Sequence, residues 1–250
     1  MNPDHTPPEL MAQRSVAAIT SALAQVAEAD HQHVDGGGWP MAADALMFLR
    51  EIVTALEPSH IVEFGSGVST VELARAADRL GGPCAVTTIE NDPAACRAVR
   101  AELEHAGVSA TVQFAPLVVR RVDGRHLPVY DLRRPRFGSH AAPGLIVVDG
   151  PPSMLGGREG SLRQALSLAM VGTILLLDDA RREADAEVFA AVARTHHDCL
   201  ETVECDGFDR GMGAFVVTAP VRVGFGDDIP TSAHSGGSTG RSGDSGSRVS

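Results

Sequence analysis

The stretch IVEFGSGVST, residues 61–70, decides how the chain is organised. An apolar run with strand propensity leads into a turn that contains Gly65 and Gly67, and Ser69 or Thr70 stands where a helix should begin. Glycines in such a turn let the backbone curl and let a ligand approach it, while the start of a helix offers free N–H groups. The stretch therefore predicts a strand, a ligand-binding turn and a helix.

Outward from this stretch, strand-like runs alternate with helical stretches. The expected strands are 61–64, 85–89, 111–114, 145–148 and 173–177, with helices expected at 70–79, 93–105 and 161–170. Because the strands are nearly all apolar and alternate with helices, they predict a parallel sheet covered on both faces. Two last β-like runs, 200–204 and 214–218, leave no room for a helix between them and predict a closing antiparallel hairpin.

The two ends of the chain differ in composition from this core. Three prolines in residues 1–9 predict a flexible N-terminus, and apolar residues at helical spacing in 10–57 predict a helical cap interrupted by HVDGGGWP. The core is expected to span residues 58–222. Residues 223–250 form a Ser/Gly-rich stretch with little to bury, which predicts a disordered tail.

Overall composition places the chain among globular proteins. Hydrophobic residues make up 44% of the 250 residues and charged residues 21%, which excludes a chain disordered throughout, a collagen-like repeat and a membrane bundle. The first residues, MNPDHTPPEL, lack the features of an export signal, so a cytoplasmic location is expected. The four cysteines show no CxxC spacing and are interpreted as reduced structural thiols.

The charge of the chain bears on its partners. A formal net charge of -11 repels phosphate backbones, so nucleic acid is not expected as a partner. No window reaches the roughly 18 uninterrupted apolar residues of a membrane span, so a membrane is not expected either. The same charge is compatible with a small-molecule enzyme and does not disfavour a cationic ligand. A small molecule is therefore the expected partner, and a homodimer is left open.

A second acidic residue strengthens the interpretation of the first turn. Glu63 lies in the first strand and Glu90 ends the second, in VTTIEND. In a doubly wound sheet, an acid at this strand end lies beside the first turn and can accept hydrogen bonds from both hydroxyls of a ribose. A dinucleotide fingerprint would need a third glycine where Thr70 stands, which argues against an NAD(P)-dependent oxidoreductase. Asp92 is expected to cap the following helix.

These segments together resemble a known family. The motifs E-x-G-S-G-x-S-T at 63–70, A-P-L at 115–117, V-D-G-P-P at 148–152 and D-D-A-x-R at 178–182, with Glu90, resemble a bacterial branch of the class I S-adenosylmethionine-dependent methyltransferases. In the D-D-A-x-R motif, Arg181 occupies the variable position and Arg182 the final position. The resemblance runs from about Gly38 to Thr218. It implies a Rossmann-like, doubly wound α/β fold with a seven-stranded sheet of order 3-2-1-4-5-7-6, strand 7 antiparallel, behind the helical cap.

The resemblance also implies a cofactor and the residues that hold it. The first motif would hold the methionine part of S-adenosylmethionine, the acid of the second strand its ribose, and the end of the third strand would lie near its adenine. Many family members have a polar residue at this last position, where the present chain has alanine. The implied cofactor-binding residues are Glu63, Gly65, Ser66, Gly67, Ser69, Thr70, Glu90, Asn91, Ala115 and Asp149.

Three carboxylates are expected to meet at the fourth and fifth strand ends. Asp149 follows the fourth strand, and Asp178 and Asp179 follow the fifth. Acids this close share protons, pair with bases or hold a cation. The set resembles metal-dependent O-methyltransferases, in which such residues hold Mg²⁺ and the metal activates an acceptor hydroxyl. The alternative is that Asp149 binds cofactor or substrate and no metal binds, while one of the others pairs with Arg181, Arg182 or Arg158.

The expected activity follows from this resemblance. The chain is interpreted as an S-adenosylmethionine-dependent methyltransferase that acts on a small molecule, most simply on an oxygen, by in-line displacement. Asp149, Asp178 and Asp179 either hold Mg²⁺ or orient and deprotonate the acceptor, and His33 is a further candidate for general base. A Rossmann-type NAD(P)-dependent oxidoreductase and a non-catalytic S-adenosylmethionine-binding module are the alternatives. The motifs do not identify the acceptor.

Overall fold

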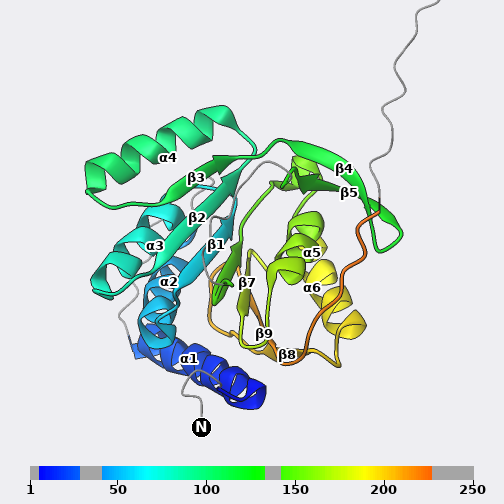
Figure 1. The fold of residues 1–250 in the computed structure, drawn as a ribbon, viewed down its shortest axis with the longest axis horizontal. Coiled ribbons are helices and arrows are strands. Elements are labelled where there is room, and N and C mark those ends of the chain that lie inside the picture. Colours follow the sequence, from blue (N-terminus) through cyan, green and yellow to red (C-terminus); the bar gives the residue numbers. More distant parts are fainter. Residues whose placement is uncertain (1–5, 29–40, 133–141, 227–250) are drawn as a thin grey trace, which may run out of the picture.

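A seven-stranded sheet divides the molecule into two helical layers in this computed structural model, which describes residues 6–28, 41–132 and 142–226 (Figure 1). The strand order is β3-β2-β1-β6-β7-β9-β8. Counted within this sheet alone, the order is the expected 3-2-1-4-5-7-6. The strands are β1 (His60–Phe64), β2 (Ala85–Glu90), β3 (Thr111–Phe114), β6 (Leu145–Val148), β7 (Ile174–Asp178), β8 (Leu200–Val203) and β9 (Met212–Val217).

The directions of the strands also agree with the sequence. The first five strands of the sheet pair in parallel, whereas β9 runs antiparallel to both β7 and β8. In this register Glu63 lies opposite Thr88 on β2 and Val147 on β6. The closing hairpin is therefore confirmed, and the carboxyl ends of the parallel strands meet at one edge of the sheet.

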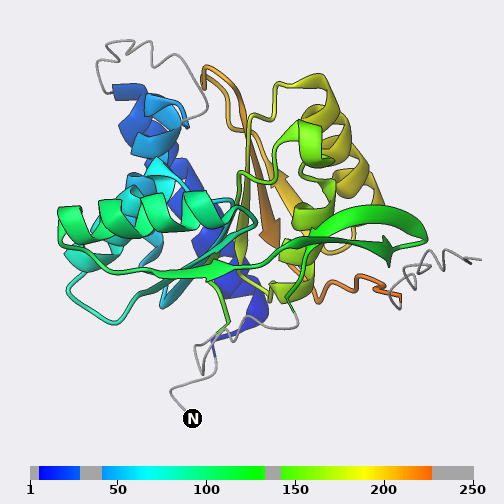
Figure 2. The same ribbon diagram turned by 90° about the horizontal axis from the view of Figure 1, so that it is seen from above.

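Helices cover both faces of the sheet (Figures 1 and 2). On one side lie α1 (Pro8–Glu28), α2 (Ala43–Leu56), α3 (Val68–Arg79) and α4 (Pro93–Ala106); on the other lie α5 (Glu159–Leu168) and α6 (Glu183–Thr195). A 3-10 turn, η1 (Ser153–Leu155), precedes α5. Within the described ranges, no helix combines the length and the apolar character needed to cross a bilayer.

Alternation along β1 shows how the sheet distributes its side chains. Ile61 packs into the cluster formed with α1 and α2, whereas Val62 and Phe64 pack into the cluster formed with α5. Successive side chains of a strand point to opposite faces, so Glu63 lies on the same face as Ile61. A carboxylate is thus buried among the apolar layers at the end of the central strand.

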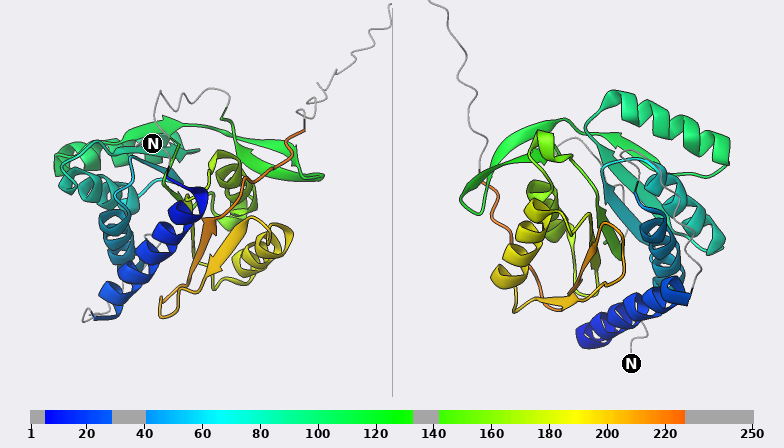
Figure 3. Two further views of the ribbon diagram at one scale, coloured as in Figure 1. Left: turned by 60° about the horizontal axis from the view of Figure 1, so that its bottom comes forward. Right: turned by 180° about the vertical axis from the view of Figure 1, so that it is seen from behind.

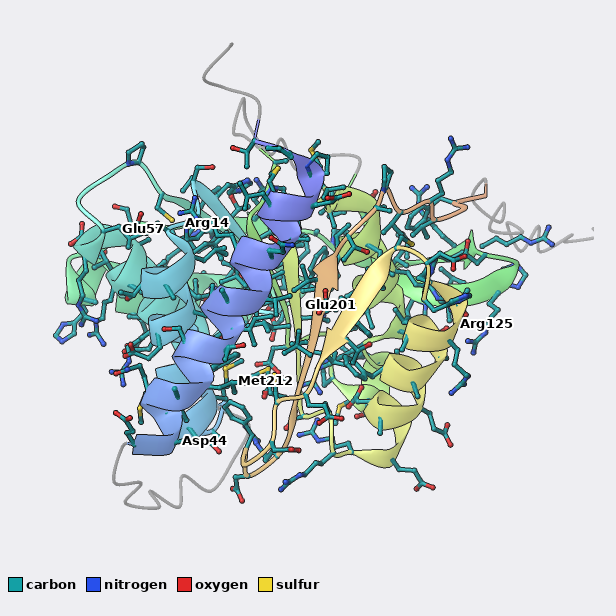
Figure 4. The ribbon with its side chains drawn as sticks, turned by 90° about the horizontal axis from the view of Figure 1, so that it is seen from below. Arg14, Asp44, Glu57, Arg125, Glu201 and Met212 are labelled. Carbon is teal, nitrogen blue, oxygen red and sulfur yellow. The ribbon has the colours of Figure 1, made fainter. Side chains whose placement is uncertain are left out.

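The N-terminal helices belong to the main core. Ile19, Phe48 and Ile52 are fully buried in one cluster with residues of β1, β6, β7 and β9. Figure 4 shows α1 lying across this face beside α2, near Met212 of β9. The helix begins at Pro8, so the segment expected to be flexible ends earlier than residue 9. Proline fits the first helical position because its missing N–H would have no helical partner there.

A hairpin that the sequence pattern did not predict follows β3. Strands β4 (Leu117–Val122) and β5 (Arg125–Tyr130) pair antiparallel as a separate two-stranded sheet beside α5 (Figure 3). The chain returns to this hairpin near its C-terminal end, where Asp123 N donates to Gly224 O at 2.8 Å and Gly226 N to Arg121 O at 2.8 Å. Residues up to 226, at the start of the segment expected to form a tail, therefore pair with the hairpin backbone.

Candidate active site

The turn between β1 and α3 is built around Gly65. Its φ of +90° lies in a region that side chains disfavour, and a Cβ added there would lie 2.9 Å from the backbone nitrogen of Gly150. The Gly65 N–H donates to Ile89 O at 2.9 Å. The first turn is therefore held against β2 and the loop after β6. A Cβ added at Gly67 would meet nothing within 4 Å, so there is free space on that side of the turn.

Thr70 joins the start of α3 to Glu63. Its hydroxyl donates to Glu63 Oε2 at 2.5 Å and accepts from the Gly67 N–H at 3.1 Å. Burial raises the pKa of Glu63 to about 7, against the opposing effect of the nearby Ser69, Thr70 and Thr88 hydroxyls. Within the described ranges, Glu63 Oε1 accepts no hydrogen bond. One oxygen of this buried carboxylate thus has no hydrogen-bond partner among the described residues.

Glu90 at the end of β2 contacts the first turn, as the sequence predicts. Its Oε2 accepts from both the N–H and the hydroxyl of Ser66 at 2.8 Å, and its Oε1 accepts from Asp92 N at 2.8 Å. Asp92 caps α4 by accepting from Ala94 N at 2.7 Å, which confirms its expected role. Glu90 is 7% exposed, and within the described ranges its Oε1 accepts one hydrogen bond.

Two further expected cofactor residues lie beside Glu90. Ala115 follows β3, is fully buried and donates its N–H to Glu90 O at 2.8 Å. Asn91 is the next residue after Glu90 and is half-buried. The ends of β1, β2 and β3 therefore adjoin one another, while the cofactor roles of these residues remain predictions.

Asp149, Asp178 and Asp179 converge as the sequence predicts. Each offers an oxygen, and these oxygens all lie within 4.8 Å of one another. Asp178 and Asp179 are 1% and 2% exposed, whereas the Asp149 side chain is 22% exposed. Burial raises the pKa of Asp149 to about 6 and that of Asp178 to about 8, and the neighbouring carboxylates add to the shift of Asp178.

A buried arginine enters this acidic cluster. Arg158 Nη2 donates to Asp149 Oδ1 at 2.6 Å and to Asp179 Oδ2 at 2.7 Å, and Nη1 donates to Asp185 Oδ2 at 3.1 Å. The arginine side chain is only 5% exposed. Burial alone would lower the pKa of Arg158, but the carboxylates outweigh burial and raise it, so the guanidinium stays charged.

Two further arginines contact Asp179. Arg182 Nη1 lies 2.9 Å from Asp179 Oδ2, and Arg210 Nε lies 3.2 Å from Asp179 Oδ1. Arg181, one of the expected pairing partners, instead donates to the Asp209 carbonyl at 3.3 Å. Asp178 Oδ2 has no hydrogen-bond partner in the described part of the chain. The cluster therefore contains one carboxylate, Asp178, without an arginine contact among these ion pairs.

The arginines decide whether the cluster suits a metal ion. Three carboxylates are the donor type that Mg²⁺ prefers. However, Asp179 already contacts three guanidinium groups, and one Arg158 nitrogen bridges Asp149 and Asp179. An ion bound to both oxygens would have to displace this buried guanidinium. The arrangement in this structure therefore does not fit Mg²⁺.

Asp185 and Arg210 are site residues that the sequence interpretation missed. Asp185 lies in the first turn of α6, and Arg210 lies in the loop before β9. Neither belongs to a motif, and only the return of the chain to the strand ends brings them to the cluster. His33, the remaining candidate for a general base, lies outside the described residues.

Comparison with solved structures identifies proteins that have a similar fold. The chain matches cofactor-bound Rv0187 from MTB over 86% of its length and 99% of that chain, with 20% identity and a TM-score of 0.55. It matches an O-methyltransferase from Bacillus cereus in complex with SAH over 80% and 90%, with 16% identity and a TM-score of 0.54. SAH-bound Podospora anserina methyltransferase PaMTH1 matches over 87% and 99%, with 14% identity and a TM-score of 0.53.

Comparison at the level of sequence does not extend this result. Neither a protein-family model nor a curated protein matches it. The structural matches, all under 25% identical, bear on the fold. Together with the strand order and the antiparallel β9, they show that the chain has the class I fold of the S-adenosylmethionine-dependent methyltransferases.

Proposed function

We propose that this protein transfers a methyl group from S-adenosylmethionine to an oxygen of a small-molecule acceptor. The observation that carries the proposal is the contact between Glu90 and the turn that contains Gly65 and Gly67. It unites an acidic strand end, a glycine turn and a helix start at the edge of the sheet where α/β proteins bind ligands. Two of the solved structures with this fold contain SAH.

The residues present suit the proposed cofactor. Glu90 Oε1 accepts one hydrogen bond and, as a carboxylate oxygen, can accept a second from a ribose hydroxyl. The free side of Gly67 leaves space beside the turn, and the unpartnered Oε1 of Glu63 can accept a hydrogen bond there. A sulfonium compound is also cationic, and buried carboxylates favour a cation. Ser66, Ser69, Thr70, Asn91 and Ala115 complete the proposed cofactor site.

We assign the proton transfer to Asp178. Glu63, the turn at Gly65 and Gly67, and Glu90 would hold S-adenosylmethionine, which would supply the methyl group and leave as S-adenosylhomocysteine. The acceptor loses its hydroxyl proton in this reaction, and Asp178 Oδ2, which has no partner among the described residues, accepts it. Asp149, the most exposed of the three carboxylates, orients the acceptor. No metal step is included, because Arg158 occupies the space between Asp149 and Asp179.

The proposed acceptor has an apolar part. Met154 and Leu155 in η1 are 75% and 44% exposed, and η1 follows the Asp149 loop directly. Large apolar side chains exposed beside a polar site are typical of a surface that contacts a ligand. The apolar part would lie against these two residues while its hydroxyl reaches the carboxylates.

Calorimetric titration with S-adenosylmethionine tests the cofactor assignment. Glu90→Ala removes the proposed ribose acceptor and should weaken binding at least about tenfold, since a lost charge-assisted hydrogen bond costs roughly 1.5–3 kcal/mol. Glu104→Ala, which removes an exposed acid from α4, should bind like the wild type. Equal affinity for the wild type and Glu90→Ala would exclude the ribose assignment.

Two further measurements separate the alternative functions. An NADH fluorescence titration that saturates, with no binding of S-adenosylmethionine, would favour an oxidoreductase. Incubation with a set of hydroxylated aromatic compounds should yield S-adenosylhomocysteine and a methyl ether. Binding of S-adenosylmethionine without either product would instead identify a non-catalytic module.

A further inference from the structure

We propose that Arg158 is the resident cation of the acidic cluster, so that Asp149, Asp178 and Asp179 work without a divalent metal ion. The proposal depends on the proposed function only in treating this cluster as the acceptor site. The ionic state of the cluster can be measured whether or not methyl transfer occurs. The inference rests on the position of one guanidinium group, on the charges around it and on the backbone that holds it.

The position of Arg158 is the first argument. Nη2 lies 2.6 Å from Asp149 Oδ1 and 2.7 Å from Asp179 Oδ2, so one nitrogen bridges two of the three carboxylates. Mg²⁺ would require oxygens at about 2.0–2.1 Å in the same space. The guanidinium would then have to leave and would lose its ion pairs with Asp149 and Asp179. Arg158 and a metal ion are therefore alternative occupants of this position.

The charge around Arg158 is the second argument. Four acidic side chains, from Asp149, Asp178, Asp179 and Asp185, meet three guanidinium groups, from Arg158, Arg182 and Arg210. When all are ionised, the group carries one net negative charge. Adding a divalent ion would leave one net positive charge in a largely buried place, which is unfavourable in a medium of low dielectric. The positive charges of the three arginines therefore balance all but one of the four negative charges.

The backbone around Arg158 is the third argument. Its carbonyl accepts from Leu162 N at 2.9 Å and from the Ser161 hydroxyl at 3.0 Å. The same hydroxyl contacts Gly150 O at 2.5 Å, and Arg158 Nη2 also donates to Asp149 O at 3.1 Å. The start of α5 is thereby joined to the Asp149 loop. These backbone contacts hold Arg158 in the cluster, whereas a side chain on the protein surface would lack them.

The arginine also gives the three carboxylates different roles. Asp149 and Asp179 both pair with Arg158, whereas Asp178 makes none of these ion pairs. We therefore regard Arg158 as a positioning residue, which holds Asp149 in place and leaves Asp178 Oδ2 as the proton acceptor. A change at Arg158 should alter the cation preference of the cluster, a property that a purely structural arginine would not control.

Titration with Mn²⁺, followed by electron paramagnetic resonance, tests the inference. The wild type should bind no Mn²⁺ at the cluster, and EDTA should leave its melting temperature and any methyl transfer unchanged. Arg158→Ala opens the space between Asp149 and Asp179 and should gain Mn²⁺ binding at the cluster, at least about tenfold tighter than any weak non-cluster binding by the wild type, with a higher melting temperature when the ion is added. Arg163→Ala is the matched control and should gain no site. Arg163 is a buried arginine within α5, one turn after Arg158, and it pairs with Glu159 and Asp123.

The wild-type titration keeps the inference falsifiable if Arg158→Ala does not fold. Stoichiometric Mn²⁺ on the wild type that disappears in Asp178→Asn would overturn the proposal, and so would a folded Arg158→Ala that gains no ion. Binding of S-adenosylmethionine is measured on the same preparations. Failure of that binding contradicts the proposed function and leaves the Mn²⁺ result intact.

Discussion

Burial of the Glu63 carboxyl at the candidate site lowers the free energy of unfolding once the pH is high enough to ionise it. The pKa of its carboxyl is raised from 4.5 to about 7 because the fold buries it, so the native state holds its proton more tightly than the unfolded state does. Below pH 4.5 both states are protonated, and above about 7 both are ionised. The contribution of Glu63 to stability therefore falls as the pH rises through this window, by roughly 3 kcal/mol in total.

Glu63→Gln tests this prediction at the residue scale. The amide stays neutral, so the free energy of unfolding of the variant relative to the wild type should increase by up to about 3 kcal/mol between pH 5 and pH 8. Urea unfolding at a series of pH values measures the difference. Glu104→Gln, at an exposed position, should show a difference that does not change with pH. A constant difference for Glu63→Gln as well would mean that this carboxyl does not carry the shifted pKa.

At the scale of elements, the β4–β5 hairpin depends on two small residues near the start of α5. A Cβ at Gly160 would lie 1.9 Å from Pro128 O, and a Cβ at Gly156 would lie 2.2 Å from Pro128 Cγ. These glycines let β5 pack directly against the segment that carries Arg158. Tyr130 and Gln164 continue the contact with two hydrogen bonds, at 2.9 and 2.7 Å.

Gly160→Ala should therefore destabilise the protein, although alanine is the better helix former. The new methyl group collides with a backbone carbonyl, which cannot rotate away, and overpacking of this kind costs about 1–3 kcal/mol or more. Chemical denaturation measures the loss. Gly82→Ala is the control, because a Cβ there meets nothing within 4 Å, and it should change stability little. A Gly160→Ala variant as stable as the wild type would show that the hairpin can move away from α5.

At the scale of the whole molecule, α1 and α2 behave as part of the sheet's core. Ile19 of α1 is fully buried in one cluster with residues of β1, β6, β7 and β9. The helices expected to form a cap thus cover one face of the sheet, as Figures 3 and 4 show. We propose on this basis that the described part of the chain unfolds as one unit.

Ile19→Ala tests whether the N-terminal helices unfold together with the sheet. Loss of a fully buried isoleucine should cost about 2–5 kcal/mol, and calorimetry should still show a single transition at a lower temperature. Leu10→Ala is the control on the same helix, since Leu10 is 53% exposed and should change the transition little. Two separate transitions in Ile19→Ala would mean that the N-terminal helices form an independent unit.

Much of the fold could be predicted because its signals are local. Strand and helix periods, the turn around Gly65 and the run without space for a helix before β9 lie in short stretches, and the resemblance supplied the strand order. The β4–β5 hairpin was missed, although Asp123-Gly124 is a typical hairpin turn with φ values of 45° and 85°. Its strands carry arginines and a proline, which weaken the alternating pattern.

The sequence by itself determined which carboxylates meet, and only the tertiary structure decided what neutralises them. Parallel strands place their carboxyl ends at one edge, so Glu63, Glu90, Asp149 and Asp178 are assigned to that edge by strand position alone. The choice of Arg158 and Arg182 over Arg181, and the arrival of Arg210, depend on how α5 and the loop before β9 approach the strand ends. Ion pairing depends on distances of a few ångströms between segments far apart in the chain, and only packing of the whole molecule sets such distances.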